Sequence, residues 1–403
     1  MKTLDLAPLP GASQRETPWR DRMDALVDRW MTSDTLYRWS VANPLTRWIT
    51  RIRARKVFDL MAGFVYSQVL LACVRLRILE TVAERPRTLD ELAQATQLPA
   101  AGLQRLLQSA LALGLLELRS RGRFGLGPLG APVAGHAGIR AMIEHHAVLY
   151  QDMQDPVAIL QASWQGAMSD YWPYAGNAEQ TPDNTSAQAY ARYSELMAAS
   201  QGFVVQEILS SYFFEEHRCV LDVGAGRGRF VSELAAHAPH LQFKMFDLPP
   251  VLALAREGLQ AKGLSERVAL HPGSFLDDPL PEGADLITLV RVAHDHPDAV
   301  VLQILQKAHA ALPLGGALLL AEPMAQPDDE AGQPGASVDA YFHFYLLAMG
   351  AGRLRTPQEL QTMIEEAGFT HVEQVPNAMP IHARILVGRK SQCLPLVHGK
   401  CVN

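Results

Sequence analysis

Four residues in the middle of the chain have the types and spacing of a ligand-binding turn. Asp222 is followed by the alternating glycines Gly224, Gly226 and Gly228. An apolar run at 219–223 comes before the turn and an amphipathic stretch after it, a pattern that predicts a buried strand, a glycine turn and a helix. Since glycine has no side chain, a ligand can lie directly against backbone N–H groups there. A dinucleotide site requires Gly-x-Gly-x-x-Gly, and here the third glycine comes one residue too early, which disfavours a nicotinamide cofactor.

This pattern of one acid and three glycines resembles the first motif of class I S-adenosylmethionine (SAM) methyltransferases; a purely structural glycine turn is the alternative. The next predicted strand, 242–246, is followed by Asp247 and Leu248. A carboxylate at that strand end can accept hydrogen bonds from both hydroxyls of a bound ribose. Ser274 and Phe275 follow the third predicted strand, and the Phe275 ring can lie against an adenine face. We therefore expect these residues to form a SAM site.

Composition sets broad limits on what the protein can be. A length of 403 residues predicts at least two domains, and a net charge of −6 gives no general case for nucleic-acid binding. The four cysteines are widely spread without metal-ligand spacing, which predicts reduced thiols in a cytoplasmic protein and no bound metal. The longest apolar runs, near 65–71 and 287–292, fall short of the ~20 residues that a membrane span needs.

From residue 218 onward, predicted strands alternate with predicted helices, which indicates a parallel sheet with helical crossovers. A helix at 357–367 comes before the last two strands. The predicted strands are 219–223, 242–246, 268–271, 285–290, 317–321, 371–375 and 383–388.

An earlier part of the chain has the pattern of a winged helix. A long apolar helix is predicted at 58–82, a capping box opens a short helix at 89–95, and a second helix follows at 101–113. A small hairpin, 115–126, completes the unit. Such a unit can read DNA, yet its second helix offers few side chains to base edges, so a structural or dimerising role is favoured.

Two further regions suggest contacts with apolar molecules. Residues 136–215 are rich in aromatic side chains, which suit the wall of a hydrophobic pocket or the packing of a core. At 19–56, tryptophans alternate with arginines, as in a helix at a membrane surface; packing against the protein itself or a partner subunit is the alternative. The predicted pocket residues are Tyr150, Trp164, Tyr171, Trp172, His343 and Met349.

Several phrases occur in the order seen in small-molecule O-methyltransferases, the family that includes the plant caffeic-acid and the acetylserotonin enzymes. The chain resembles that family over about residues 57–389, and two long phrases, 58–72 and 341–353, look like the 1-hydroxycarotenoid (demethylspheroidene) O-methyltransferases of phototrophic bacteria. The shorter phrases are Phe246-Asp-Leu-Pro249, Gly273-Ser-Phe275, Arg291-Val-Ala-His-Asp-His296, Ala321-Glu322 and Arg355-Thr-Pro-Gln-Glu359.

The resemblance implies a fold and a division of the chain. We expect an α/β protein with the class I methyltransferase sheet: Rossmann-like, seven-stranded, mostly parallel, with the last strand antiparallel. A mainly α-helical winged-helix domain at the N-terminal side would make a homodimer. The expected segments are an extension at 1–56, the dimerisation domain at 57–135, a helical pocket linker at 136–215, the SAM-binding domain at 216–390 and a tail at 391–403.

The resemblance also implies catalytic roles. His294, after the fourth predicted strand, matches the family's general base, and imidazole titrates near neutrality. Glu322 matches the acid that orients that histidine and fixes its tautomer. His296, two residues on, replaces a common tryptophan and is a rival base. Arg291 replaces a lysine of the family and is expected near the cofactor. A simple surface role is the alternative for His294 and for Glu322.

Two other departures from the family bear on the site. Ser274 stands where the family often has an acid, which removes one expected contact to adenine. Leu354 stands where the family has a second orienting acid, so Asp339 or His343 would have to supply that contact, and an apolar residue there suits a hydrocarbon substrate.

The sequence thus predicts transfer of a methyl group from SAM to the tertiary hydroxyl of a 1-hydroxycarotenoid, of the demethylspheroidene or hydroxyneurosporene type. The partners expected are this carotenoid, a second copy of the chain and possible contact with the surface of the photosynthetic inner membrane, in a cytoplasmic protein that binds no nucleic acid. One alternative is a phenolic or polyketide acceptor; a less favoured one is a winged-helix regulator that senses a ligand.

Overall fold

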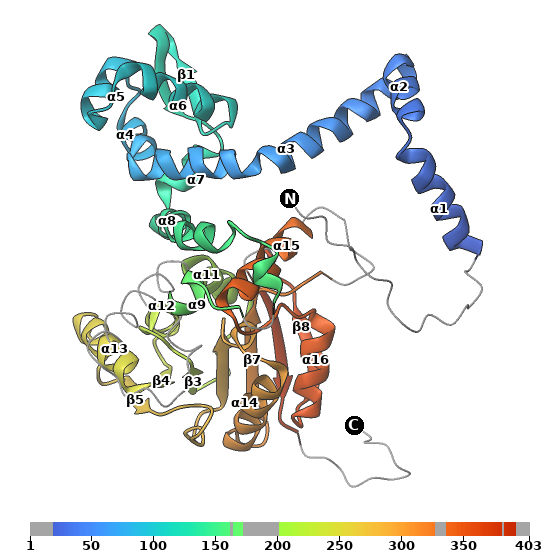
Figure 1. The fold of residues 1–403 in the computed structure, drawn as a ribbon. Helices are drawn as coiled ribbons and strands as arrows, with labels where there is room; N and C mark the ends of the chain where they lie inside the picture. The colour runs from blue at the N-terminus through green and yellow to red at the C-terminus, as the bar shows by residue number, and fades with distance from the viewer. Residues whose placement is uncertain (1–18, 162–163, 172–200, 327–335, 381–382, 392–403) are drawn as a thin grey trace. The chain divides into compact units, whose positions relative to one another are not determined.

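A computed structural model of the chain describes residues 19–161, 164–171, 201–326, 336–380 and 383–391 (Figure 1). The chain divides into two compact units, Met1–Ala72 and Cys73–Asn403. Each unit is described by itself. The predictions for Trp172 and for most of the C-terminal tail lie outside the described residues, as does the side chain of Tyr171.

The first unit consists of helices α1 (Trp19–Met31), α2 (Asp34–Ala42) and most of α3 (Pro44–Arg75). The expected boundary at 56/57 falls inside α3, which begins 14 residues before the predicted start of that helix at 58. The run of Arg and Lys at 47–56 does not interrupt the helix, because long cationic side chains are good helix formers. By length and composition alone, α3 could cross a membrane; the sequence prediction that no segment reaches that length was therefore wrong.

The winged-helix prediction agrees with the local elements of the second unit. Helices α4 (Ile78–Glu84), α5 (Leu89–Thr96) and α6 (Ala100–Ala112) precede a hairpin of β1 (Leu116–Arg119) and β2 (Arg123–Leu126). The predicted capping box is present at α5, where the Thr88 hydroxyl accepts from the Glu91 N–H and the Glu91 carboxylate accepts from the Thr88 N–H. The predicted helix 58–82 is interrupted at Arg77, which has a φ of 52° and separates α3 from α4.

The main sheet has seven strands in the order β5-β4-β3-β6-β7-β9-β8 (Figure 1). Strands β3 to β7 run parallel, and β9 runs antiparallel to both of its neighbours, which agrees with the expected fold class. The chain order reverses between β3 and β6, and the carboxyl ends of strands beside such a switch point form the usual ligand site of an open α/β sheet. The strands are β3 (Cys219–Val223), β4 (Gln242–Asp247), β5 (Val268–Pro272), β6 (Leu286–Val290), β7 (Ala317–Glu322), β8 (Thr370–Val375) and β9 (Arg384–Arg389).

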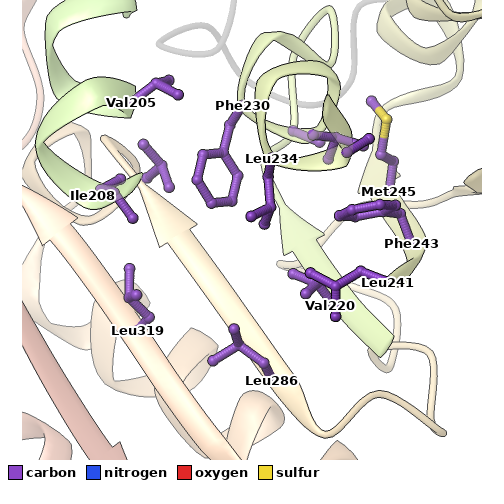
Figure 2. Packing of buried hydrophobic residues seen from close by; sticks show 14 of the residues in the cluster. Val205, Ile208, Val220, Phe230, Leu234, Leu241, Phe243, Met245, Leu286 and Leu319 are labelled. Carbon is purple, nitrogen blue, oxygen red and sulfur yellow. The ribbon is translucent and has the colours of Figure 1, made fainter. Parts of the chain in front are cut away.

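Alternate residues of the central strands enter two hydrophobic cores, one on each face of the sheet. On one face Val220 and Leu286 pack with Phe230 of α12 (Arg229–His237), as Figure 2 shows. On the other face Leu221 and Ile287 pack with α14 (Asp298–Ala311) and α16 (Pro357–Glu366). Because both faces are covered, the central strands are apolar at nearly every position, which explains why their sequence pattern is an apolar run rather than an alternation of apolar and polar residues.

The remaining helices complete the second unit. Helix α13 (Pro249–Ala261) connects β4 to β5, and α11 (Gly202–Ser211) packs in the same core as α12. Helices α8 (Ala137–Asp152), α9 (Ala167–Tyr171) and α15 (Ala336–Met349) pack together through a third apolar cluster. Helix α7 (Gly130–Gly135) precedes α8.

Residues 350–356, after α15, contact the turn at 293–296 that follows β6 and fix its position. Arg355 is 2% exposed, and its guanidinium donates to the carbonyls of Ala293 (2.8 Å) and His296 (2.7 Å) and to the Asp298 carboxylate. Gly352 has a φ of 77°, and a Cβ there would lie 2.0 Å from the His294 carbonyl oxygen. The position of the turn therefore depends on both the charge of Arg355 and the missing side chain of Gly352.

Arg355→Met is expected to destabilise the protein by about 2 kcal/mol, because one buried and one partly buried carbonyl lose a charged donor. The free energy of unfolding in urea measures this loss. Arg256→Met, at an exposed position of α13, removes the same charge and is expected to leave the stability close to that of the wild type. Equal stability of the two variants would contradict this role of Arg355.

Candidate active site

The glycine turn after β3 leaves backbone exposed at the edge of the sheet. Gly224 has a φ of 70°, and a Cβ there would lie 2.7 Å from a methyl group of Val292, so a side chain does not fit. Gly226 has a φ of 55°, and a Cβ there would meet no atom within 4 Å. The turn thus packs tightly on one side and opens on the other, as a turn that takes a ligand against its backbone requires. Gly228, the third glycine, precedes the first residue of α12.

Asp247 lies beside this turn at the end of β4. Its Oδ2 accepts from the Gly226 N–H and its Oδ1 from the Leu248 N–H, both at 2.7 Å. Burial raises the pKa of the Asp247 carboxyl to about 6, although both backbone N–H groups favour the charged form. Since each carboxylate oxygen can accept a second hydrogen bond, Asp247 keeps capacity for ribose hydroxyls.

Asp222 lies beneath the turn, 2% exposed, and accepts a hydrogen bond of 2.7 Å from the Thr288 hydroxyl of β6. The pKa of Asp222 is raised to about 7, chiefly by burial; the Thr288 hydrogen bond opposes this rise and the neighbouring Asp247 adds to it. The hydrogen bond joins the two strands at the switch point. Asp222 therefore supports the turn from below, a task that the sequence pattern alone does not separate from ligand binding.

The loop of Ser274 and Phe275 follows β5. The Ser274 N–H donates to the Asp278 carboxylate, and the Phe275 ring meets the His296 ring edge-on, with centroids 5.2 Å apart. The Lys307 ammonium of α14 donates to the carbonyls of Phe275, Leu276 and Asp278 at 2.8–2.9 Å. Sequence reasoning missed Lys307, because no local pattern marks a helix lysine that reaches a loop 29 to 32 residues away.

His294 lies in one turn of 3₁₀ helix, Ala293–Asp295, after β6, and is 6% exposed. Its Nδ1 is 2.5 Å from Oε2 of Glu322 at the end of β7. Oε1 of Glu322 accepts from the N–H groups of Val292 (2.8 Å) and Ala293 (2.7 Å). The structure thus brings the predicted base and the predicted orienting acid together, and the backbone holds that acid in place.

Asp295 is a neighbour that sequence reasoning did not single out. Its Oδ1 lies 3.2 Å from Nε2 of His294, so carboxylates lie at both nitrogens of the ring. Burial works against a charged His294, but Asp295 and Glu322 together raise the pKa of the imidazole above its ordinary value. Burial also raises the pKa of Asp295, against the opposing charges of His294 and Arg291.

His296, the rival base, has the opposite electrostatic character. Its pKa is lowered to about 4, chiefly by burial and also by the charge of His294. It is therefore neutral at pH 7 and a much weaker base than His294. Arg291 stands at the start of the same turn with a φ of 58°, and its N–H donates to the Ala321 carbonyl.

The predicted pocket residues have different environments. Tyr150 and Trp164 are half-buried, and within the described part of the chain the buried indole N–H of Trp164 has no hydrogen-bond partner. Met349 is 2% exposed in the apolar cluster of α8, α9 and α15, and Leu354 belongs to the same cluster. His343 is exposed on α15. The other suggested orienting acid, Asp339, accepts from the Gln326 N–H.

Two histidine–tyrosine pairs join α8 to α15 in this region. The Tyr341 hydroxyl is 2.7 Å from Nε2 of His146, and the Tyr345 hydroxyl is 3.1 Å from Nε2 of His145. Burial lowers the pKa of His145 to about 4 and raises that of Tyr341. Burial also lowers the pKa of His146. The two hydrogen-bonded pairs satisfy polar groups beside the apolar cluster.

The strand order, the open glycine turn and the carboxylate at the end of β4 define a class I SAM-dependent methyltransferase. The family profiles agree: the O-methyltransferase domain matches residues 150–370, and the O-methyltransferase dimerisation domain matches residues 58–131. The chain therefore belongs to the O-methyltransferase family and is a SAM-dependent O-methyltransferase, and its dimerisation domain supports a homodimer.

Individual relatives lie within the same family. The chain is 41% identical over 343 residues to the demethylspheroidene O-methyltransferase of Rhodobacter capsulatus, covering 85% of this chain and 84% of the relative. It is 28% identical to the acetylserotonin O-methyltransferase of Mus musculus, covering 82% and 87% of the two chains. The structure of human N-acetylserotonin methyltransferase in complex with SAM shares the fold, with a TM-score of 0.70 and 22% identity over 84% of this chain and 98% of that chain.

The residues at the sheet edge fit SAM. The open backbone at Gly226 and the unused acceptor capacity of Asp247 suit a nucleoside, and the half-buried Phe275 offers an aromatic face at the same edge. Among the described residues, no group of three or more His, Cys, Asp or Glu side chains is placed to hold a metal ion.

Asp247→Asn is expected to weaken the binding of S-adenosylhomocysteine by about 10- to 100-fold, because hydrogen bonds to a charged group contribute ~1.5–3 kcal/mol. Isothermal titration calorimetry measures this affinity. Asp277→Asn, an exposed acid in the loop after β5, is the matched control and is expected to bind normally. Normal affinity of Asp247→Asn would contradict the assignment.

Glu322→Gln is expected to move the acidic limb of the pH profile of kcat/KM to lower pH. If His294 must lose its proton to act, the activity of the wild type is expected to rise with pH above the ordinary imidazole pKa, because Asp295 and Glu322 raise the pKa of His294. Removing the Glu322 charge lowers the pKa of His294 and so shifts the rise downward. The control is Glu366→Gln, at an exposed position of α16. An unmoved limb would contradict the coupling.

Proposed function

We propose that the protein methylates the tertiary hydroxyl of a 1-hydroxycarotenoid of the demethylspheroidene type, with His294 as general base. The observation that carries the proposal is the buried imidazole of His294 at the carboxyl edge of the sheet, with Nδ1 held by Glu322. Support for the acceptor comes from the 41% and 40% identical relatives, which are named demethylspheroidene O-methyltransferases.

In this reaction SAM supplies an electrophilic methyl group on a sulfonium, and its transfer to oxygen leaves S-adenosylhomocysteine. The protein's task is to align the acceptor hydroxyl and to take its proton. Alignment of two reactants can lower a barrier by about 7–11 kcal/mol, and a positioned base contributes ~10²–10⁴-fold. Neutral His294 takes the proton at Nε2, because Glu322 holds the hydrogen at Nδ1.

A tertiary alcohol is far less acidic than a phenol, so its proton leaves late, as the new O–C bond forms. A stronger base helps such a reaction, and Asp295 and Glu322 strengthen His294 by stabilising its protonated form. Leu354, which stands where the family has a second orienting acid, is buried in an apolar cluster with Met349, and an apolar residue at this position supports a hydrocarbon acceptor.

The acceptor is tested by incubating the protein with methyl-labelled SAM and a panel of 1-hydroxycarotenoids beside phenols. We expect label in the methyl ether of the carotenoids. Label only in phenols would reject the carotenoid acceptor and favour the alternative suggested by phenolic relatives, such as the 3-hydroxy-5-methyl-1-naphthoate 3-O-methyltransferase at 28% identity.

The base is tested on the acceptor that the panel identifies. His294→Gln is expected to lower kcat by about 10²–10⁴-fold with little change in the affinity for S-adenosylhomocysteine. His296→Gln, two residues away, is expected to lose less than about tenfold, since a histidine with a pKa of about 4 is a poor base at pH 7. Wild-type activity of His294→Gln would remove it as the base.

A further inference from the structure

The segment Trp19–Lys56 lies before the part of the chain that the dimerisation profile matches, which begins at residue 58. It contains nine Arg or Lys and four Asp, a net charge of +5, whereas the whole chain has a net charge of −6. Positive charge is therefore concentrated in this segment of an otherwise acidic protein. Such segregation indicates a partner with negative charge.

The segment also presents large apolar side chains to its surroundings. Trp30 of α1, Trp39 of α2 and Trp48 of α3 are 59%, 53% and 59% exposed. In α1 and at the start of α3 these side chains recur at helical spacing. They are Trp19, Met23, Leu26, Val27, Trp30 and Met31 in α1, and Leu45, Trp48, Ile49 and Ile52 in α3. Each helix therefore has an apolar face that the segment itself leaves exposed.

The contacts between α2 and α3 are polar. The Thr46 hydroxyl donates to the Ser40 carbonyl (2.9 Å), and the Thr50 hydroxyl donates to the Ser40 hydroxyl (3.0 Å). The Arg47 guanidinium donates to the last carbonyls of α2, at Val41 and Ala42. No residue of α2 is buried. Hydrogen bonds thus join α2 to α3, and Trp39 and Trp48 are more than half exposed beside this junction.

We infer that Trp19–Lys56 docks on an anionic lipid surface. Interfacial helices combine exposed Trp and Leu on one face with Arg and Lys beside it, and tryptophan favours the headgroup level of a bilayer. At the start of α3 the cations Arg51, Arg53, Arg55 and Lys56 are all exposed and occur among the apolar side chains. Acidic headgroups complement these cations, and acyl chains cover the apolar face.

The neighbouring apolar surface of α3 belongs to a different contact. Leu60, Met61 and Phe64 are 64–84% exposed, and they fall inside the dimerisation profile at 58–131, where a second copy is the expected partner. The cationic segment ends where this range begins. The biological use of lipid docking rests on the proposed function, because an apolar carotenoid acceptor dissolves in the membrane.

The test is flotation of the full-length protein with vesicles of phosphatidylcholine, with or without phosphatidylglycerol. The wild type is expected to float with the anionic vesicles and to be released at ~1 M salt, where the Debye length falls to ~3 Å. Combined Arg51→Gln, Arg53→Gln and Arg55→Gln are expected to weaken partitioning by about 100-fold. At moderate salt, where charge attraction is weakened, the wild type is still expected to float through its tryptophans. Combined Trp30→Ser, Trp39→Ser and Trp48→Ser are expected to abolish this remaining flotation.

The control removes three charges elsewhere, by Arg105→Gln, Arg121→Gln and Arg256→Gln at exposed positions, and is expected to float as the wild type does. Light scattering and binding of S-adenosylhomocysteine show whether each variant keeps its oligomeric state and fold. The inference is overturned if the wild type does not float, or if the arginine variant floats like the control. It is also overturned if the variants lose the dimer, because the surface of Trp19–Lys56 would then bind a second copy of the chain. None of these measurements depends on the methyl acceptor.

Discussion

The carboxylate of Glu322 is the contact on which the active site depends. It is 1% exposed at the end of β7, accepts from two consecutive backbone N–H groups after β6, and contacts Nδ1 of His294. One side chain thus joins the backbone that follows β6 to the imidazole of His294. It can do so only because β6 and β7 are paired in parallel with Val290 opposite Ala321, which places both strand ends at the same edge.

The same arrangement sets the strength of the base. Two carboxylates beside the imidazole make it a better proton acceptor, but they also hold it protonated up to a higher pH. Such a base would suit the weakly acidic alcohol that we propose as the acceptor, with less activity at low pH. His296 shows the contrast two residues away, where burial near a cation lowers the pKa to about 4. Two histidines that are two residues apart thus have pKa values shifted in opposite directions, because burial and the neighbouring charges differ between them.

Local patterns were sufficient for the strands and the capped helices. The bounds of β3 were predicted to the residue, because an apolar run that stops at a glycine marks both its burial and its end. The meeting of His294 with Glu322 followed from strand order and family resemblance. Lys307, Asp295 and the supporting role of Asp222 were not predicted, since each depends on a tertiary contact that leaves no periodic trace. The start of α3 was predicted too late, because the run of Arg and Lys at 47–56 was interpreted as the end of a segment. Such a run indicates an exposed surface, and the helix continues through it.

The central claim is that Glu322 and Asp295 make His294 a strengthened base with its hydrogen held at Nδ1. The most direct measurement is an NMR pH titration of histidine labelled with ¹³C and ¹⁵N in the ring, with the His294 signal assigned from its loss in His294→Gln. The claim predicts a pKa above the ordinary value near 6.5 and, above that pKa, a neutral ring that carries its hydrogen at Nδ1. A pKa at or below the ordinary value, or a neutral ring with its hydrogen at Nε2, would contradict it.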